Sequence, residues 1–238
     1  MLSVILPCFN EAKGLLSIVQ RYADSRGEVD IELILVDNGS KDETPSVMRQ
    51  LAQEFSFVRP FRVVNNKGYG DGILQGLRQA SGEWLAWSHA DLQTDPADVL
   101  RAFCTLQAAR DPRRTLVKGC RSGRAMSERI ITWGMQMVAL VLLRRRFHEI
   151  NAQPKIFHRD LLAEMVAPPV DFNFDVYVLY QARRAGWRLA TIPVQFPPRQ
   201  YGHSNWSKTW GSKSRTIWRS LWFMVKLGGG LWHGSNQK

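Results

Sequence analysis

The sequence has few cysteines, and they stand far apart. Cys8, Cys104 and Cys120 form no CxxC pair, so their spacing predicts neither a disulfide framework nor a zinc site and fits a reducing compartment. No apolar run reaches the roughly 20 residues that a membrane-spanning helix needs. The first residues place no basic stretch ahead of their short apolar run, which predicts that the chain begins without a secretory signal peptide.

Acidic residues are missing from the end of the chain. Residues 199–238 hold seven Lys or Arg and no Asp or Glu. Residues 1–110 hold 11 basic and 14 acidic side chains, a net charge of −3, whereas residues 111–238 hold 21 and 7, a net charge of +14. This asymmetry predicts an anionic partner that meets only one half of the molecule, such as nucleic acid, anionic lipid or a phosphorylated ligand.

The first half of the chain alternates short apolar runs with amphipathic segments. The periodicity predicts strands at 2–7, 31–37, 60–65, 83–89 and 115–120, and helices at 12–25, 43–55, 70–81 and 97–109. This alternation predicts an α/β fold with a mostly parallel central sheet flanked by helices. Ligands of such sheets bind beyond the carboxyl ends of the strands. Three polar clusters fall at those ends, "PCFNEA", "VDNGSKDE" and "SHADLQTD", and they predict a site there.

The second half carries apolar segments with basic flanks. Residues 130–143 are mostly apolar, with Arg129 before them and Arg144 directly after. A buried helix and an interfacial helix with arginines at lipid headgroups both fit this pattern. Residues 206–233 hold five of the nine tryptophans among basic residues, which predicts an amphipathic membrane-surface segment. A nucleic-acid partner would explain none of the strand-end acids, so we expect no nucleic acid among the partners.

Two strand-end aspartates have alternative interpretations. Asp37 can accept hydrogen bonds from a ribose hydroxyl or a base N–H, or it can close a local turn around Asn38 and Ser40. In "HADLQ", Asp91 and the Gln93 amide offer the oxygen ligands that Mg²⁺ or Mn²⁺ takes beside substrate phosphates. His89 fits either a metal contact or a phosphate contact. Asp95, which precedes a proline, is predicted to cap a helix.

Seven segments in order carry a family resemblance. They are "LPCFNEAKG", "ILVDNGSKDET", "NKGYGDGILQGLRQASGEW", "HADLQTDP", "KGCRSG", "EINAQPKIFHRD" and "FDVYVLYQARRAGWRLATIPVQFPPRQYGHSNWSK". Over residues 2–210 the chain resembles the family 2 inverting glycosyltransferases, most closely the branch of dolichyl-phosphate mannosyltransferases and polyprenyl-phosphate glycosyltransferases. The resemblance implies a GT-A fold, a GDP- or UDP-sugar donor, and Mg²⁺ or Mn²⁺ bound through a DxD-type motif.

The resemblance also implies roles for particular residues. The expected donor-binding residues are Pro7, Phe9, Glu11, Asp37, Lys67, His89, Ala90, Arg199 and Lys208. Lys67 comes from the glycine-rich loop rather than from the resemblance, and it equally fits a solvated loop lysine. The expected metal ligands are Asp91, Gln93 and His89. Arg121 and Lys155 are expected at an acceptor phosphate, and Asp91, Glu149 and Arg121 are expected to be catalytic.

The chain departs from the family pattern at several of these positions. His89 stands where the metal motif has its first Asp, and Glu149 where "DxxxGFR" has Asp. Asn38 replaces the second Asp of "VDDGS", and Gln153-Pro154 replaces Gly-Phe. Loss of one carboxylate should weaken the bare metal site. A catalytically weak nucleotide-sugar-binding membrane protein is therefore one alternative function.

These observations combine into one expected enzyme. We expect a GT-A domain over residues 1–209, with nucleotide-binding and acceptor-binding halves at 1–120 and 121–209, and a membrane-associating tail at 210–238. The expected reaction moves a sugar to a polyprenyl phosphate at the cytoplasmic face of a membrane, with the protein bound peripherally. Transfer to a sugar hydroxyl of a lipid-linked or cell-surface glycan is the alternative, and it needs a base. Glu149 is the candidate base, or else it forms an ion pair that orients Arg121 or Lys155.

Overall fold

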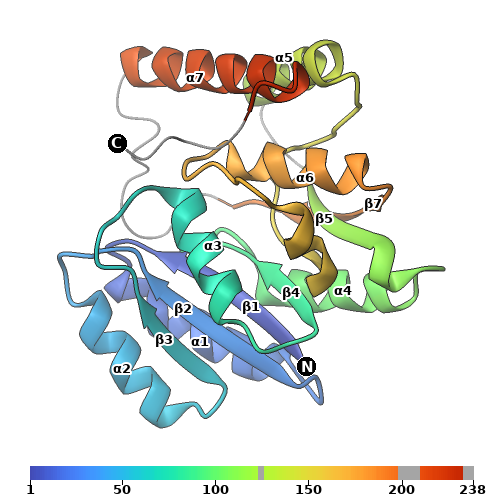
Figure 1. The fold of residues 1–238 in the computed structure, drawn as a ribbon. Coiled ribbons are helices and arrows are strands. Elements are labelled where there is room, and N and C mark those ends of the chain that lie inside the picture. Colours follow the sequence, from blue (N-terminus) through green and yellow to red (C-terminus); the bar gives the residue numbers. More distant parts are fainter. Residues whose placement is uncertain (123–125, 198–209, 233–238) are drawn as a thin grey trace.

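Seven strands form one central sheet in the order β3-β2-β1-β4-β6-β5-β7. The computed structural model describes residues 1–122, 126–197 and 210–232, without the side chains of 126–132 and 210–215 (Figure 1). The strands are β1 (Leu2–Cys8), β2 (Ile31–Asp37), β3 (Val58–Arg62), β4 (Trp84–Trp87), β5 (Thr115–Ser122), β6 (Lys155–His158) and β7 (Arg188–Gln195). The α-helices are α1 (Ala12–Ser25), α2 (Thr44–Glu54), α3 (Tyr69–Gln79), α4 (Pro96–Gln107), α5 (Met126–Leu143), α6 (Phe174–Arg184) and α7 (Trp210–Gly228). Two 3₁₀ helices are η1 (Pro112–Arg114) and η2 (Arg159–Glu164).

All strands of the sheet except β6 run in one direction. β1 is parallel to β2 and β4, β2 is parallel to β3, and β5 is parallel to β7. β6 is antiparallel to both of its neighbours, β4 and β5. The carboxyl ends of six strands therefore meet at one edge of the sheet, and β6 begins at that edge. The predicted α/β fold with a mostly parallel sheet is confirmed.

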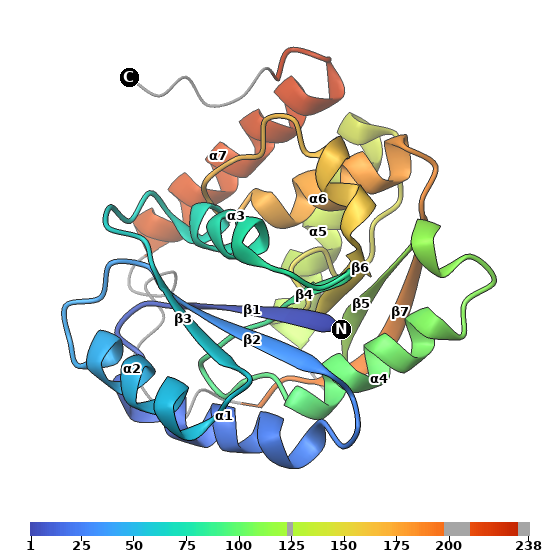
Figure 2. The ribbon, with the colours of Figure 1, turned by 60° about the horizontal axis from the view of Figure 1, so that its bottom comes forward.

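Two apolar layers cover the two faces of the sheet. Successive side chains of a strand point to opposite faces, and in β1 Val4 and Leu6 pack against α1, α2 and α4 while Ile5 packs against α3 and α6. Figure 2 shows α1, α2 and α4 on one side of the sheet and α3, α5, α6 and α7 on the other. Burial of each such side chain contributes about 1.5–3 kcal/mol, so both helix layers are held by the strands between them.

Helices α5 and α7 lie side by side at the outside of one layer (Figure 1). A Cβ on Gly228 would lie 2.1 Å from the Leu142 carbonyl oxygen, so the helices approach too closely there for any larger residue. In α7, Phe223 and Met224 are buried, whereas Trp222 is 61% exposed. Each helix therefore has one face in the core and one face outside it.

The same division appears in α5, for which a buried and an interfacial helix both fitted the sequence. Ala139 and Leu143 are buried, whereas Trp133 is 62% and Val141 is 70% exposed. Among the residues that the structure describes, no helix combines the length and apolar character needed to cross a membrane. Contact with a membrane surface stays a prediction for these helices.

The sequence patterns missed part of the second half and displaced one strand. β6, α6 and β7 were not predicted, although they complete the sheet and one helix layer. β3 lies at Val58–Arg62 rather than at 60–65. It pairs only with β2 at the end of the sheet and is mostly exposed, so its side chains show little of the burial pattern that marks a strand.

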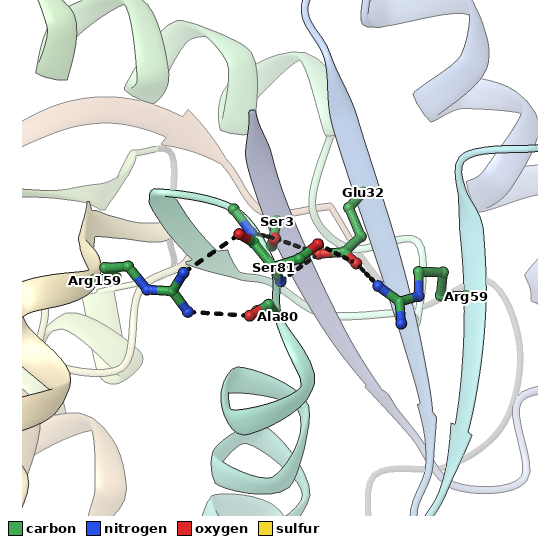
Figure 3. Close-up of polar contacts among 7 residues, drawn as sticks. Ser3, Glu32, Arg59, Ala80, Ser81 and Arg159 are labelled. Atoms are coloured by element: carbon green, nitrogen blue, oxygen red, sulfur yellow. Dashed lines mark hydrogen bonds and ion pairs between the residues drawn. The ribbon is translucent and has the colours of Figure 1, made fainter.

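A buried carboxylate fixes the edge of the sheet where β1 and β2 begin (Figure 3). Glu32 accepts hydrogen bonds from Ser3 Oγ at 2.5 Å and from Ser81 N and Oγ at 2.9 and 2.8 Å, and it pairs with Arg59. Arg159 Nη1 donates to the Ser81 carbonyl oxygen at 3.3 Å. Burial alone would raise the pKa of Glu32, but these hydrogen bonds lower it. This network ties the start of β4 to β1 and β2 at the edge opposite the carboxyl ends of these strands.

Candidate active site at the carboxyl edge of the sheet

The first two polar clusters are bonded to each other, as the sequence predicted from a parallel sheet. Asn10 N donates to Ser40 Oγ at 2.9 Å, and Glu11 N donates to Thr44 Oγ1 at 2.9 Å. Lys41 N donates to Asn10 Oδ1 at 2.8 Å. These bonds join the loop after β1 to the loop after β2, because the two parallel strands end side by side.

Acids from all three clusters surround the end of β1. Burial raises the pKa of the Cys8 thiol, and the negative charges of four carboxylates raise it further. Those carboxylates belong to Glu11, Asp37, Asp42 and Asp91. The third cluster is tied in by Ser88 N, which donates to the Ile5 carbonyl oxygen at 3.1 Å. One acidic region therefore forms at this edge of the sheet.

Asp37 ends β2 inside this region and is 2% exposed. Its Oδ1 accepts a hydrogen bond from Ser40 N at 2.8 Å, which closes the local turn that the sequence offered as one alternative. Its Oδ2 lies 3.4 Å from Arg62 Nε but receives no hydrogen bond from the described part of the chain. A buried carboxylate oxygen without a donor is uncommon, so the turn leaves an acceptor atom available for the predicted nucleoside contact.

The other expected donor-binding residues lie on or beside the same loops where the structure describes them. Pro7 is in β1, Phe9 is 37% exposed after it, and Glu11 immediately precedes α1. Lys67 lies exposed before α3, which contributes Gly68 at its N-cap. Arg199 and Lys208 lie outside the described residues.

The segment after β4 divides into a cap and a set of candidate ligands. Asp95 accepts a hydrogen bond from Ala97 N at 3.0 Å and caps α4, which confirms that prediction. Asp91 Oδ1 accepts from Gln93 N at 3.2 Å. Gln93 Nε2 donates to the Pro197 carbonyl oxygen at 3.0 Å, so the amide nitrogen holds the loop after β7 and its oxygen is not part of that bond.

His89 lies between two aromatic rings beside Asp91. Its ring centroid is 6.0 Å from that of Tyr69 and 6.5 Å from that of Phe196. Burial lowers the pKa of the imidazole, even though the charges of Asp91 and Asp175 favour its protonated form. The neutral imidazole is the form that binds metals or accepts hydrogen bonds. Ala90, the residue between His89 and Asp91, is buried.

The oxygen ligands here fit a divalent cation that also binds substrate phosphates. Within residues 1–122, 126–197 and 210–232, no three His, Cys, Asp or Glu side chains are grouped to hold a metal on their own. Mg²⁺ and Mn²⁺ in nucleotide sites need only one or two protein carboxylates, with phosphate and water oxygens completing the shell. Asp91, the Gln93 amide oxygen and neutral His89 are suitable ligands for such a partial shell.

Arg121 and Glu149 form an ion pair where we expect the acceptor. Arg121 Nε lies 2.7 Å from Glu149 Oε2, and each side chain is 13% exposed. Arg121 is in β5, and its guanidinium lies 5.5 Å from the ring centroid of Phe196. Glu149, in the loop before β6, has a φ of 47°, a conformation that costs free energy for a non-glycine residue. The pairing is the one that the sequence offered as the alternative to a catalytic base.

Lys155 lies inside the protein. It is 0% exposed, and its Nζ donates to Asp175 Oδ1 at 2.5 Å and to the Ala152 carbonyl oxygen at 3.2 Å. The Lys155 ammonium is therefore paired with the Asp175 carboxylate. Contact of Lys155 with an acceptor phosphate stays a prediction. Burial lowers the pKa of Lys155, while the Asp175 charge acts to raise it.

A buried polar network that the sequence patterns did not reveal joins Lys155 to the site. Gln153 Nε2 donates to Asp175 Oδ1 at 3.1 Å and to Tyr69 Oη at 2.9 Å. The Tyr69 ring contacts His89. Asp175 offered one signal, because an acid inside the apolar run "FDVYVLY" needs a buried partner. Gln153 and Tyr69 offered none, since either fits a loop or a helix start.

The site thus combines an acidic region at the carboxyl edge of the sheet with a neighbouring arginine, Arg121. The profile of Glycosyl transferase family 2 matches residues 3–165. The chain belongs to this family and is a glycosyltransferase, as its sequence motifs predicted.

Two relatives of this chain are named as polyprenyl-phosphate sugar transferases. Human dolichyl-phosphate beta-glucosyltransferase is 27% identical over 241 residues, which cover 92% of this chain and 71% of that protein. The undecaprenyl-phosphate 4-deoxy-4-formamido-L-arabinose transferase of Proteus mirabilis is 25% identical over 211 residues, covering 86% of this chain and 62% of that protein.

A solved structure has the same fold. Glucosyl-3-phosphoglycerate synthase from Mycobacterium tuberculosis, in complex with Mn²⁺, UDP-glucose and phosphoglyceric acid, superposes with a TM-score of 0.74 at 18% identity. The match covers 97% of this chain and 80% of that one. The fold is therefore GT-A, as predicted.

Proposed function

We propose that this glycosyltransferase moves a sugar from a nucleotide-diphosphate sugar, GDP- or UDP-linked, to a polyprenyl phosphate at a membrane surface. The observation that carries the proposal is that the acidic carboxyl edge of the sheet and Arg121 come together beside His89. The His89 ring centroid lies 6.5 Å and the Arg121 guanidinium 5.5 Å from the ring centroid of Phe196, and Asp91 follows His89 by two residues. The named relatives, whose acceptors are dolichyl and undecaprenyl phosphates, support this acceptor class.

The donor half comprises residues 1–120 in this proposal. Asp37 receives the nucleoside through Oδ2, and the loops that carry Phe9 and Lys67 flank it. Asp91 and Gln93 hold Mg²⁺ or Mn²⁺, with His89 beside them. The bound cation neutralises charge on the leaving diphosphate. A fold neighbour crystallised with Mn²⁺ and UDP-glucose supports the metal. We assign Arg199 and Lys208 to the same diphosphate, on the family resemblance alone.

The acceptor half comprises residues 121–209. A phosphate acceptor is already ionised, so its oxygen attacks the sugar carbon without a base, and the protein must only hold its charge. Arg121 has the position for this, because its guanidinium lies at the end of β5 and is fixed by Glu149 at 2.7 Å. Glu149 thus orients a cation and removes no proton. Lys155 is buried behind this region, where it donates a hydrogen bond to Asp175, which also accepts one from Gln153.

The outer faces of α5 and α7 form the proposed membrane contact. Trp133 and Val141 of α5 and Trp218 and Trp222 of α7 are all more than 60% exposed. Large apolar patches on a soluble surface mark interaction sites, and tryptophan beside basic residues suits the headgroup region. We place the protein peripherally on the cytoplasmic face of a membrane, with residues 210–238 as its main contact.

The proposal is tested by measuring transfer of labelled sugar from UDP- and GDP-sugars to undecaprenyl or dolichyl phosphate, with Mn²⁺ or Mg²⁺. We expect transfer that EDTA stops, and a loss of at least about 100-fold with Asp91→Ala, as for removal of a group that stabilises the leaving charge. Asp95→Ala is the matched control. This variant removes a helix cap worth about 1 kcal/mol. We assign Asp95 to no ligand, so transfer should persist. Equal activity of wild type and Asp91→Ala would refute the metal role.

A further inference from the structure

Four aromatic rings form a continuous row along the carboxyl edge of the sheet. The rings of Phe172 and Tyr69 are stacked, with centroids 5.2 Å apart and planes inclined by 20°. Tyr69 then contacts His89 at 6.0 Å, and His89 contacts Phe196 at 6.5 Å. These residues come from four separate segments: the approach to α6, the start of α3, and the loops after β4 and β7. Tertiary structure alone brings them together.

Each ring of this aromatic row keeps part of its surface accessible, although Tyr69 also packs against the core. Phe172 is 55% exposed, and Tyr69, His89 and Phe196 are each partly exposed. A row of aromatic faces that stays accessible next to a catalytic edge is suited to an apolar ligand.

The two ends of the aromatic row differ in chemistry. At the inner end, the Arg121 guanidinium lies 5.5 Å from the Phe196 ring centroid. At the outer end, Asp171, the neighbour of Phe172, pairs with Arg219 of α7 at 3.0 Å. The exposed Trp218 adjoins Arg219 in α7. The row therefore leads from a cation in the site to the helix that we place at the membrane.

We infer that the aromatic row binds the first isoprenoid units of the acceptor, which rests on the proposed function. With its phosphate at Arg121, a polyprenyl phosphate must carry its hydrocarbon chain back to the membrane. The rings of Phe196, Tyr69 and Phe172 offer apolar faces along a path between those two points, with the neutral imidazole of His89 between them. Flat, methyl-branched isoprene units pack well on such faces.

A sugar ring is the other ligand that stacks on aromatic faces. A single ring close to Asp91 is enough for a donor sugar, and His89 or Phe196 would supply it. Phe172 is separated from His89 by Tyr69, and it lies beside the α7 contact rather than beside Asp91. The length and direction of the row therefore favour a chain over a sugar.

The test uses monophosphates with one head group and prenyl chains of 5, 10, 15 and 20 carbons, without membranes. In the wild type we expect KM for the acceptor to fall as the chain lengthens. Phe172→Ala should raise KM for the 20-carbon acceptor about five- to tenfold, as for loss of one aromatic contact. The KM for the 5-carbon acceptor and for the donor should stay unchanged.

Two matched variants separate ring contact from other effects. Tyr69→Phe keeps the ring and loses only the hydroxyl that bonds Gln153, so the dependence on chain length should persist, whereas Tyr69→Ala should flatten it. Leu16→Ala removes an apolar side chain that is also 55% exposed but lies on α1, across the sheet, and should change nothing. Circular dichroism and thermal melts check that each variant is folded.

Calorimetry of the same phosphates without donor keeps the inference testable if no transfer occurs. Affinity that rises with chain length, and that no longer does so in Phe172→Ala, supports the row even where the proposed reaction fails. Unchanged dependence on chain length in folded Phe172→Ala and Tyr69→Ala overturns the inference. A changed donor KM with unchanged acceptor KM shows sugar binding and overturns it too, as does the absence of binding by any prenyl phosphate.

Discussion

Arg121 and Glu149 are joined by a 2.7 Å ion pair although they come from segments that enter the site in opposite directions. Arg121 lies near the carboxyl end of β5, whereas Glu149 precedes β6, which runs antiparallel to β5. A carboxylate held this way is a poor base, because protonation of Glu149 would break its pairing with Arg121. It is well placed to fix the guanidinium.

Glu149→Gln should therefore preserve catalysis with a phosphate acceptor. The amide oxygen still accepts a hydrogen bond from Arg121, so we expect kcat within about tenfold of wild type and a raised KM for the acceptor. Loss of a general base lowers the rate by about 10²–10⁴-fold. Steady-state kinetics over pH 6–9 distinguish the two roles. A kcat lowered beyond 100-fold at unchanged acceptor KM would identify Glu149 as a base.

His89→Asp should tighten the binding of Mg²⁺ in the presence of UDP or GDP. The substitution adds a carboxylate two residues from Asp91, and hard divalent cations prefer such oxygens to imidazole. We expect the dissociation constant for Mg²⁺ to fall several-fold in calorimetric titrations. His89→Asn is the control, because it has similar size to Asp without the charge. Equal Mg²⁺ affinity in His89→Asp and His89→Asn would show that this position lies away from the metal.

Trp218→Ala with Trp222→Ala should weaken binding to anionic vesicles at least about tenfold, since each large side chain contributes about 1.5–3 kcal/mol when it leaves water. The two side chains are 72% and 61% exposed, so their loss should leave the thermal melt unchanged. Sedimentation with vesicles measures the effect, and Leu16→Ala is the control. Deleting the whole helix is a less specific test, because Phe223 and Met224 of α7 belong to the core. Full sedimentation of the double variant would show that the membrane contact lies elsewhere on the protein.

Lys118 should make stability depend on pH. Burial, together with the charge of the nearby Lys155, lowers the pKa of this lysine to about 7. Between pH 7 and about 10 the unfolded chain binds a proton that the folded chain lacks, so the free energy of unfolding rises with pH. One such group contributes up to about 1.4 kcal/mol per pH unit.

Lys118→Met should reduce this slope. Urea denaturation at pH 7.5, 8.5 and 9.5 measures it in both proteins, and Lys155, which is also buried, keeps its own contribution in the variant. A slope that is the same in wild type and Lys118→Met would show that Lys118 titrates at its ordinary pKa in the folded protein. The absolute stability of the variant is a separate quantity, since Lys118 Nζ also donates to the carbonyl oxygens of Gly119 and His148 at 2.7 and 2.8 Å.

The donor side of the site was predictable because it follows from local patterns. Buried parallel strands have continuous apolar runs, and the polar residues after β1, β2 and β4 must then share an edge. Asp95 was recognised as a cap from the proline that follows it. The boundaries of α1 and β2 agree with the sequence patterns.

The acceptor side was less predictable because it depends on contacts between distant segments. β6 has only four residues, too few for a periodicity. Lys155 was expected at an acceptor phosphate, and nothing near it in the chain indicates its buried pairing with Asp175 of α6. The row from Phe172 to Phe196 likewise involves four segments, and no local window contains more than one of its rings.

The reversal of β6 brings two kinds of segment to the same edge of the sheet. Donor loops leave the sheet after strands, whereas the segment with Glu149 and Gln153 arrives at the same edge before a strand. An insertion or deletion in that arriving segment alters the acceptor side without shifting the register of β1, β2 or β4. A single antiparallel strand thus places the segment that we assign to the acceptor beside the loops that we assign to the nucleotide.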